Sequence, residues 1–128
     1  MTVPMLLRIA AIVAAPFHWV ANKVGESTMS LRSTLTPGVY HGLNIKPPFF
    51  EGWYYKLVSA DERNKVAIIP GVILGQDAHA FLQVLDGVDG TTAYLKFPVQ
   101  DFRADDRHFA IDIGENRFDE CDLCLALN

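Results

Sequence analysis

From Thr36 onward, short apolar runs alternate with turn-forming residues at close and regular spacing. The breaks at 61–64, 75–77, 87–90 and 114–116 are rich in Gly, Asp, Asn and Glu, which favour turns. No helix-length segment separates the runs, so we expect an antiparallel meander rather than a parallel α/β sheet. The predicted strands are Trp53–Ser59, Lys65–Ile73, Ala78–Asp86, Thr91–Phe97, Arg107–Ile113 and Cys121–Leu127.

Alternation within these runs predicts which side of each strand is buried. In the runs at 107–113 and 121–127, apolar residues alternate with polar or small ones, which indicates one buried face and one solvated face. The run at 65–73 is apolar on both faces, and its Pro70 predicts a bulge or an edge position. The expected fold class is therefore all-β, with six strands suited to a sandwich or a barrel wall.

Composition narrows the function classes. The chain has 128 residues, enough for one domain, and half of them are hydrophobic, which excludes wholesale disorder. A net charge of −4 argues against binding to nucleic acid through its phosphates. Cys121 and Cys124 would point to opposite faces of a strand, and no second ligand pair accompanies them, so we expect no metal site. The sequence also contains no GxGxxG, P-loop or HExxH motif.

Residues 1–28 form an apolar leader that is separate from the strand-rich body. A charged Arg8 before an apolar run is typical of a signal or anchor segment. The apolar spacing from Leu6 to Val20 also fits an amphipathic helix lying on a membrane surface. Alternatively, Met29 is the true start and the upstream residues are a mis-assigned leader. These readings leave two locations open, the cytoplasm or the periphery of a membrane.

The segment at 46–57 is the densest chemical feature of the chain. Period 2 places Glu51 on one strand face with Trp53, Tyr55 and Leu57, the face expected to be buried. Burial favours the neutral form of a carboxylic acid, and an acid kept protonated near neutral pH can donate a proton. A purely structural role, with the carboxylate closing one end of a barrel, stays open.

Two motifs in this region resemble the start of the tocopherol cyclase family. They are Tyr40-His41-Gly42 and the run at 49–56, FFEGWYYK, which is similar to the family's FFEGWYFK signature. Weaker pieces at 69–71, 80–86 and 114–118 follow in the family's order. The resemblance covers about residues 36–128 and implies a lipocalin-like β-barrel. Since family members are much longer, we expect this segment to be the N-terminal portion of such a domain.

The resemblance implies cyclisation of a prenylated quinol to a chromanol, a redox-neutral reaction that needs no cofactor. Such an enzyme needs a proton donor for an isoprenoid double bond, and Glu51 is the first candidate, with Asp77 and Asp86 as alternatives. The partner would be a hydrophobic prenylated small molecule, with peripheral membrane association compatible with it. Other functions left open are a lipocalin-like isoprenoid or lipid carrier without catalysis, and a carotenoid hydratase-like enzyme.

The remaining candidate residues would bind the substrate. Aromatic rings at the signature could stabilise a carbocation through their π faces. Side chains that share a strand face in the run at 78–86, and a histidine before the signature, could orient a quinol hydroxyl. The ring candidates are Trp53, Tyr54 and Tyr55, and the others are His79, Phe81, Gln83 and His41.

Overall fold

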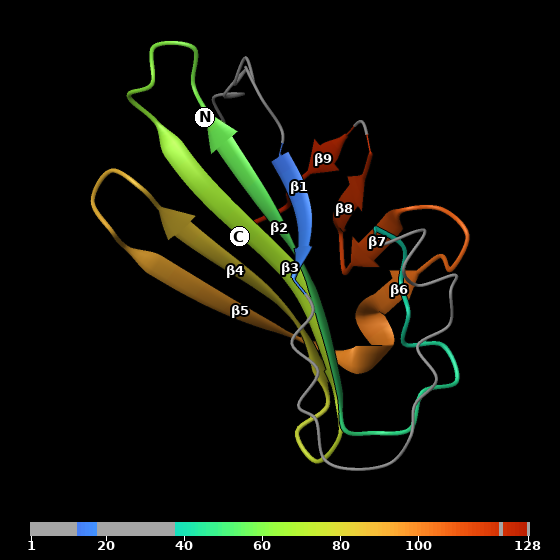
Figure 1. Cartoon of the computed structure of the whole chain (residues 1–128). Helices are drawn as coiled ribbons and strands as arrows, with labels where there is room; N and C mark the ends of the chain where they lie inside the picture. The colour runs from blue at the N-terminus through green and yellow to red at the C-terminus, as the bar shows by residue number, and fades with distance from the viewer. Residues whose placement is uncertain (1–12, 18–37, 121, 128) are drawn as a thin grey trace.

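The computed structural model describes residues 13–17, 38–120 and 122–127, and these form two antiparallel sheets (Figure 1). The elements are β1 (Val13–Phe17), β2 (Phe49–Val58), β3 (Lys65–Leu74), β4 (His79–Asp86), β5 (Thr92–Pro98), the short helix η1 (Val99–Asp101), β6 (Phe102–Ala104), β7 (Ala110–Ile113), β8 (Asn116–Asp119) and β9 (Leu123–Cys124). Within the described ranges, no helix is long and apolar enough to cross a membrane.

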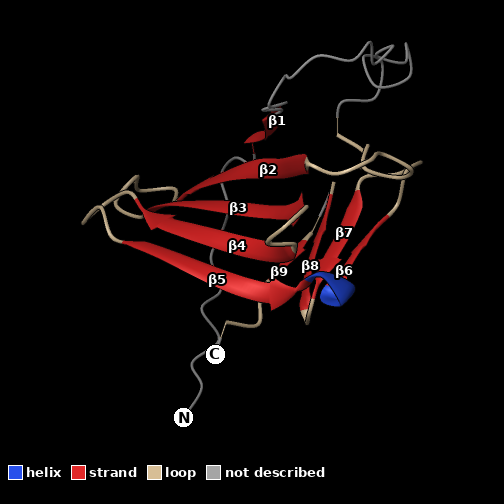
Figure 2. Cartoon of the chain, turned by 90° about the horizontal axis from the view of Figure 1, so that it is seen from below, coloured by secondary structure: helices blue, strands red, loops and turns tan. Residues whose placement is uncertain are grey.

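Both sheets are meanders, in which each strand pairs with its neighbour in sequence. The first sheet has the order β1-β2-β3-β4-β5 and the second the order β6-β7-β8-β9. Figure 2 shows the two layers, with η1 at the point where β5 leads into β6. The prediction of an all-β antiparallel meander is therefore confirmed. The described strands form two separate sheets rather than a closed barrel.

The prediction of a helical leader is wrong for its central part. Val13–Phe17 is a strand that pairs antiparallel with β2, from Val13 opposite Lys56 to Phe17 opposite Gly52. Helical spacing of apolar residues was the signal for a helix, but Pro16 is unfavourable in a helix interior and is tolerated in an edge strand. Pairing with β1 also satisfies backbone groups along one side of β2. The rest of the leader, 1–12 and 18–28, lies outside the described residues.

The predicted strands are found with shifted bounds, and β6 and β8 were missed in addition to β1. β2 begins four residues earlier than predicted, at Phe49. The last two predicted strands are shorter, reduced to β7 and β9. β6 and β8 were not predicted, because β6 is only three residues long and β8 alternates polar residues with the single large apolar Phe118.

The core lies between the two sheets. Trp53, Tyr55 and Leu57 of β2 point to this side, as alternation predicted, and all three are buried. The ring of Tyr55 lies 6.1 Å from that of Phe109 and 5.6 Å from that of Phe118, which joins the first sheet to the second. Other buried residues of this cluster are Ile68, Ala80, Leu82, Ile111 and Ile113.

The expectation for Pro70 is wrong, because β3 is a central strand between β2 and β4. Pro70 keeps its register with Leu82 on the β4 side. On the β2 side the paired positions stop at Gly52 opposite Gly71 and resume at Tyr55 opposite Ile68, with no extra residue on either strand. The missing N–H of proline is thus accommodated by a local gap in pairing rather than by a bulge.

Candidate functional site

Glu51 and His41 form a buried pair near the start of β2. The Glu51 residue is 0% exposed, on the core face of the strand. Its Oε2 accepts a hydrogen bond from the backbone N–H of His41 at 2.9 Å, and its Oε1 lies 2.6 Å from His41 Nδ1. A contact this short between the two side chains requires a proton between them. The predicted burial of Glu51 is confirmed, and both carboxylate oxygens are engaged by one residue.

A tight turn after His41 brings this residue back onto β2. The backbone N–H of Ile45 donates to the carbonyl of Gly42 at 3.3 Å. A Cβ at Gly42 would overlap the Tyr40 hydroxyl and the Phe49 ring, so both side chains would have to shift to admit a larger residue. The two motifs that carry the family resemblance, at 40–42 and 49–56, therefore meet in space.

We expect Gly42→Ala to lower the free energy of unfolding by about 1–3 kcal/mol, because the added methyl group would overpack this turn. The measurement is urea unfolding followed by circular dichroism. Gly38→Ala is the matched control, since a Cβ there would meet Phe109 only at ordinary contact distance, 3.9 Å. Equal stability of the two variants would contradict the close approach at Gly42.

Tyr40 belongs to the site, although the sequence analysis assigned no role to it. Its ring lies 5.2 Å from that of Phe102, 6.1 Å from that of Phe49 and 6.5 Å from that of Trp53. Burial raises the pKa of the Tyr40 phenol, and the negative charge of Glu51 raises it further. The only signal that could have identified Tyr40 is its position next to His41.

Trp53 and Tyr55 lie on the same strand face as Glu51 but are packed into the core. The indole N–H of Trp53 donates to the backbone carbonyl of Gly38 at 2.8 Å. The Tyr55 hydroxyl is buried and has no hydrogen-bond partner among the described residues. Burial, with the charge of Asp119 as a second cause, raises the pKa of Tyr55. Both rings therefore belong to the core between the two sheets.

Tyr55→Phe is expected to leave the free energy of unfolding unchanged or to raise it by up to about 1 kcal/mol, because a buried hydroxyl without a partner is desolvated at a cost. Chemical denaturation measures this. Tyr94→Phe is the comparison, since its hydroxyl has a partner in His79, and its loss should cost about 0.5–1 kcal/mol. Destabilisation of Tyr55→Phe beyond that of Tyr94→Phe would show that the Tyr55 hydroxyl does make a stabilising contact.

The other predicted site residues lie on the opposite face of the first sheet. His79, Phe81 and Gln83 of β4 share that face with Tyr94 of β5, and Tyr54 of β2 is on the same side. The ring of Phe81 stacks between those of Phe50 and Tyr94, with centroid distances of 5.9 and 5.2 Å. The sheet therefore separates this group from Glu51 and His41, and the predicted residues do not form one site.

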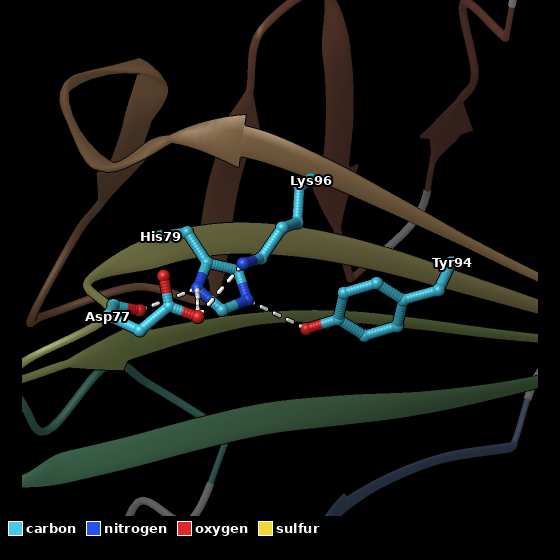
Figure 3. A network of polar contacts seen from close by, with 4 residues as sticks. All are labelled: Asp77, His79, Tyr94 and Lys96. Atoms are coloured by element: carbon cyan, nitrogen blue, oxygen red, sulfur yellow. Dashed lines mark hydrogen bonds and ion pairs between the residues drawn. The ribbon is translucent and has the colours of Figure 1, made fainter.

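A polar network orders this second group (Figure 3). The His79 Nδ1 lies 2.6 Å from the backbone carbonyl of Asp77, which can only accept, so this nitrogen carries the proton. The His79 Nε2 lies 2.9 Å from the Tyr94 hydroxyl, so both ring nitrogens are engaged within the protein. Lys96 donates to the Asp77 carboxylate at 2.8 Å.

The contacts of Asp77 and Asp86 do not favour proton donation. The hydrogen bond from Lys96 and its charge lower the pKa of Asp77, which is the opposite of what a general acid near neutral pH needs. Asp86 accepts backbone N–H groups of Val88 and Asp89, at 2.7 and 3.4 Å, and so stabilises the turn after β4. Glu51 remains the acid candidate with the strongest structural support.

A shallow hollow of about 580 Å³ opens beside the turn that follows His41. Leu43 lines it from that turn, Arg103 and Asp112 line it from β6 and β7, and Arg107 lines it from the loop between these strands. Among the described residues, no group of three His, Cys, Asp or Glu side chains is placed to hold a metal ion.

Comparison of the chain with protein-family models, with curated proteins and with solved structures finds no match.

Proposed function

We propose that this protein catalyses the acid-promoted cyclisation of a prenylated quinol to a chromanol. The observation that carries the proposal is the wholly buried Glu51 carboxylate held at 2.6 Å from His41. The pair is formed by the two sequence motifs that resemble the tocopherol cyclase family. A carboxyl group and an imidazole that share a proton away from bulk water are suited to general acid catalysis.

The reaction requires one proton to be added and one to be lost. A proton adds to the isoprenoid carbon nearer the ring, and the π electrons of the double bond form the new C–H bond. This leaves a tertiary cation on the neighbouring carbon. The phenolic oxygen attacks that cation to form the C–O bond of the chromanol ring, and the phenolic proton is then released. Substrate and product are isomers, so no oxidant or reductant is consumed.

The different exposure of the two side chains favours different roles for Glu51 and His41. The Glu51 side chain is 1% exposed and lies deeper than that of His41, which is 16% exposed. His41 is therefore the more exposed member of the pair, although its Nε2 is itself buried. In the proposed mechanism His41 delivers the proton, and Glu51 orients its ring and stabilises the imidazolium. Direct protonation by Glu51 stays a prediction. The rings of Tyr40 and Phe49 beside the pair would stabilise a cation by about 0.5–2 kcal/mol each, depending on desolvation.

Incubation of the protein with a detergent-solubilised prenylated quinol tests the proposal, with chromatography of the products as the readout. A chromanol formed faster than in the protein-free control supports it. Tight binding without turnover would contradict it and favour an isoprenoid carrier. Addition of water to give a tertiary alcohol would favour a hydratase instead, because water would then capture the same cation.

A further inference from the structure

The outer face of the first sheet carries a tyrosine whose hydroxyl is hydrogen-bonded to a histidine (Figure 3). Tyr94 of β5 is 49% exposed, whereas His79 of the neighbouring β4 is 8% exposed. The contact therefore joins a ring that solvent can reach to a base that is largely shielded from solvent. It lies on the opposite side of the sheet from Glu51, and the proposed function makes no use of it.

The direction of these hydrogen bonds follows from the groups around His79. Its Nδ1 lies 2.6 Å from the backbone carbonyl of Asp77, so this nitrogen carries the proton of the neutral imidazole. The Nε2 atom is then an acceptor, and the Tyr94 hydroxyl donates to it at 2.9 Å. The phenolic proton of Tyr94 is therefore already directed at an unprotonated nitrogen.

The surroundings of His79 would stabilise the ring after it accepts a second proton. The Asp77 carbonyl keeps its hydrogen bond from Nδ1, and the Asp77 carboxylate lies 3.6 Å from the same nitrogen. The hydrogen bond from Lys96, at 2.8 Å, and the lysine's charge lower the pKa of Asp77 and so keep its carboxylate ionised. This carboxylate would then be shared by two cations, the imidazolium and Lys96.

Aromatic packing fixes the orientation of the Tyr94 ring. The ring stacks on that of Phe81 at a centroid distance of 5.2 Å and an interplanar angle of 14°. Phe81 in turn stacks on Phe50, at 5.9 Å and 12°, and covers Gly71, where a Cβ would overlap it. The Tyr94 hydroxyl is thus held toward His79 while the residue stays half-exposed.

A phenol bonded to a base can lose an electron without first becoming a phenolate. Partial burial raises the pKa of the Tyr94 phenol, so prior ionisation of this group is disfavoured. Loss of the electron alone would leave a phenol radical cation, which is a strong acid. A histidine nitrogen that accepts the proton as the electron leaves avoids both species, in the same way that a positioned general base assists other proton transfers.

We propose that Tyr94 is a redox-active tyrosine, oxidised at the protein surface by a diffusible one-electron oxidant such as a peroxyl radical. The O–H bond of Tyr94 breaks, its electron passes to the oxidant, and its proton passes to Nε2 of His79. A neutral tyrosyl radical is left beside an imidazolium. The peroxyl radical becomes a peroxide anion and takes a proton from water, and the imidazolium neutralises the hydroxide that remains.

The tyrosyl radical would be consumed by reaction with a second one. Two Tyr94 radicals on different chains join through ring carbons next to the phenolic carbons. The proton on each of these ring carbons then moves to the phenolic oxygen, which gives dityrosine without further oxidation. The half-exposed ring makes such a link between chains sterically accessible.

Flash oxidation of the full chain by photogenerated tris(bipyridyl)ruthenium(III) tests this site, with transient absorption of the tyrosyl radical as the readout. We expect Tyr94→Phe to lower the rate of radical formation at least about tenfold, because a positioned base accelerates proton transfer by about 10²–10⁴-fold. Tyr54→Phe is the matched control and should keep the wild-type rate. Tyr54 is 36% exposed on the same sheet face but lies two strands away from His79.

His79→Gln separates the base from the hydrogen bond. The glutamine carbonyl can accept from the Tyr94 hydroxyl but does not take up a proton near neutral pH. We expect this variant to slow radical formation as strongly as Tyr94→Phe, with circular dichroism showing that the sheets persist. Because Tyr94 is half-exposed, Tyr94→Phe keeps the test decisive even where the histidine variant does not fold.

A wild-type rate of radical formation for Tyr94→Phe, or for folded His79→Gln, would overturn the proposal. After steady illumination, mass spectrometry of the wild type should locate dityrosine at Tyr94. Dityrosine confined to other tyrosines would contradict the proposal as well. None of these readouts requires a quinol, so their outcome is independent of the proposed function.

Discussion

Glu51→Gln is expected to lower the rate of chromanol formation by at least about 100-fold, the lower end of what general acid catalysis contributes. The amide has nearly the same volume and can still accept the backbone N–H of His41. It carries no charge, however, so it cannot stabilise an imidazolium at Nδ1 or share its proton. Initial rates with a detergent-solubilised prenylated quinol measure the effect.

Glu115→Gln is the matched control for this prediction, because Glu115 is exposed in the turn between β7 and β8. Its rate should equal that of the wild type. Circular dichroism of Glu51→Gln should show that the sheets persist, since a buried position is changed. A wild-type rate for a folded Glu51→Gln protein would remove Glu51 from the mechanism.

His41→Asn separates the two routes for the proton. If His41 delivers the proton, this variant should lose activity as severely as Glu51→Gln. If Glu51 protonates the alkene directly, the loss should be much smaller. His108→Asn is the control, because His108 is exposed in the loop between β6 and β7.

Phe118→Ala is expected to lower the free energy of unfolding by about 3–5 kcal/mol, the range for deletion of a buried aromatic ring. Phe118 is 0% exposed, and its ring lies 5.6 Å from that of Tyr55. It therefore links the second sheet to the first. Because small domains are stable by only about 5–15 kcal/mol, the change should be visible in equilibrium urea unfolding.

Val88→Ala, at an exposed turn position, should change the stability by less than about 0.5 kcal/mol and serves as the control. A cost below about 1 kcal/mol for Phe118→Ala would contradict a shared core between the two sheets. Separate unfolding transitions for the two sheets in the wild type would contradict it as well.

Local alternation was sufficient to predict the part of the site that lies on one strand. Period 2 places Glu51, Trp53 and Tyr55 on the same side of β2, and burial follows because that side faces the second sheet. Strand alternation could not predict which residue pairs with Glu51. His41 is ten residues away, and only the turn at Gly42 brings it back, a long-range contact that no periodicity encodes.

Other features depended on pairing between distant strands. The apolar spacing around Val13–Phe17 fits a helix, whereas the strand there is set by its pairing with β2. β8 was missed because its inward side contains a polar residue: Asn116 is buried and donates from Nδ2 to the Ile113 carbonyl at 2.9 Å. The hydrogen bond between His79 and Tyr94 depends on the register of β4 with β5, and this register cannot be predicted from the sequence of either strand alone.

Reaction of the wild-type protein in deuterated water tests the central claim most directly. If the buried pair protonates the alkene, mass spectrometry should find one carbon-bound deuterium in the chromanol, on the ring carbon next to the quaternary carbon that bears the oxygen. The labelled product should accumulate with the wild type and fall to near the protein-free rate with Glu51→Gln. No chromanol from the wild type, or equal accumulation with the two proteins, would contradict the claim.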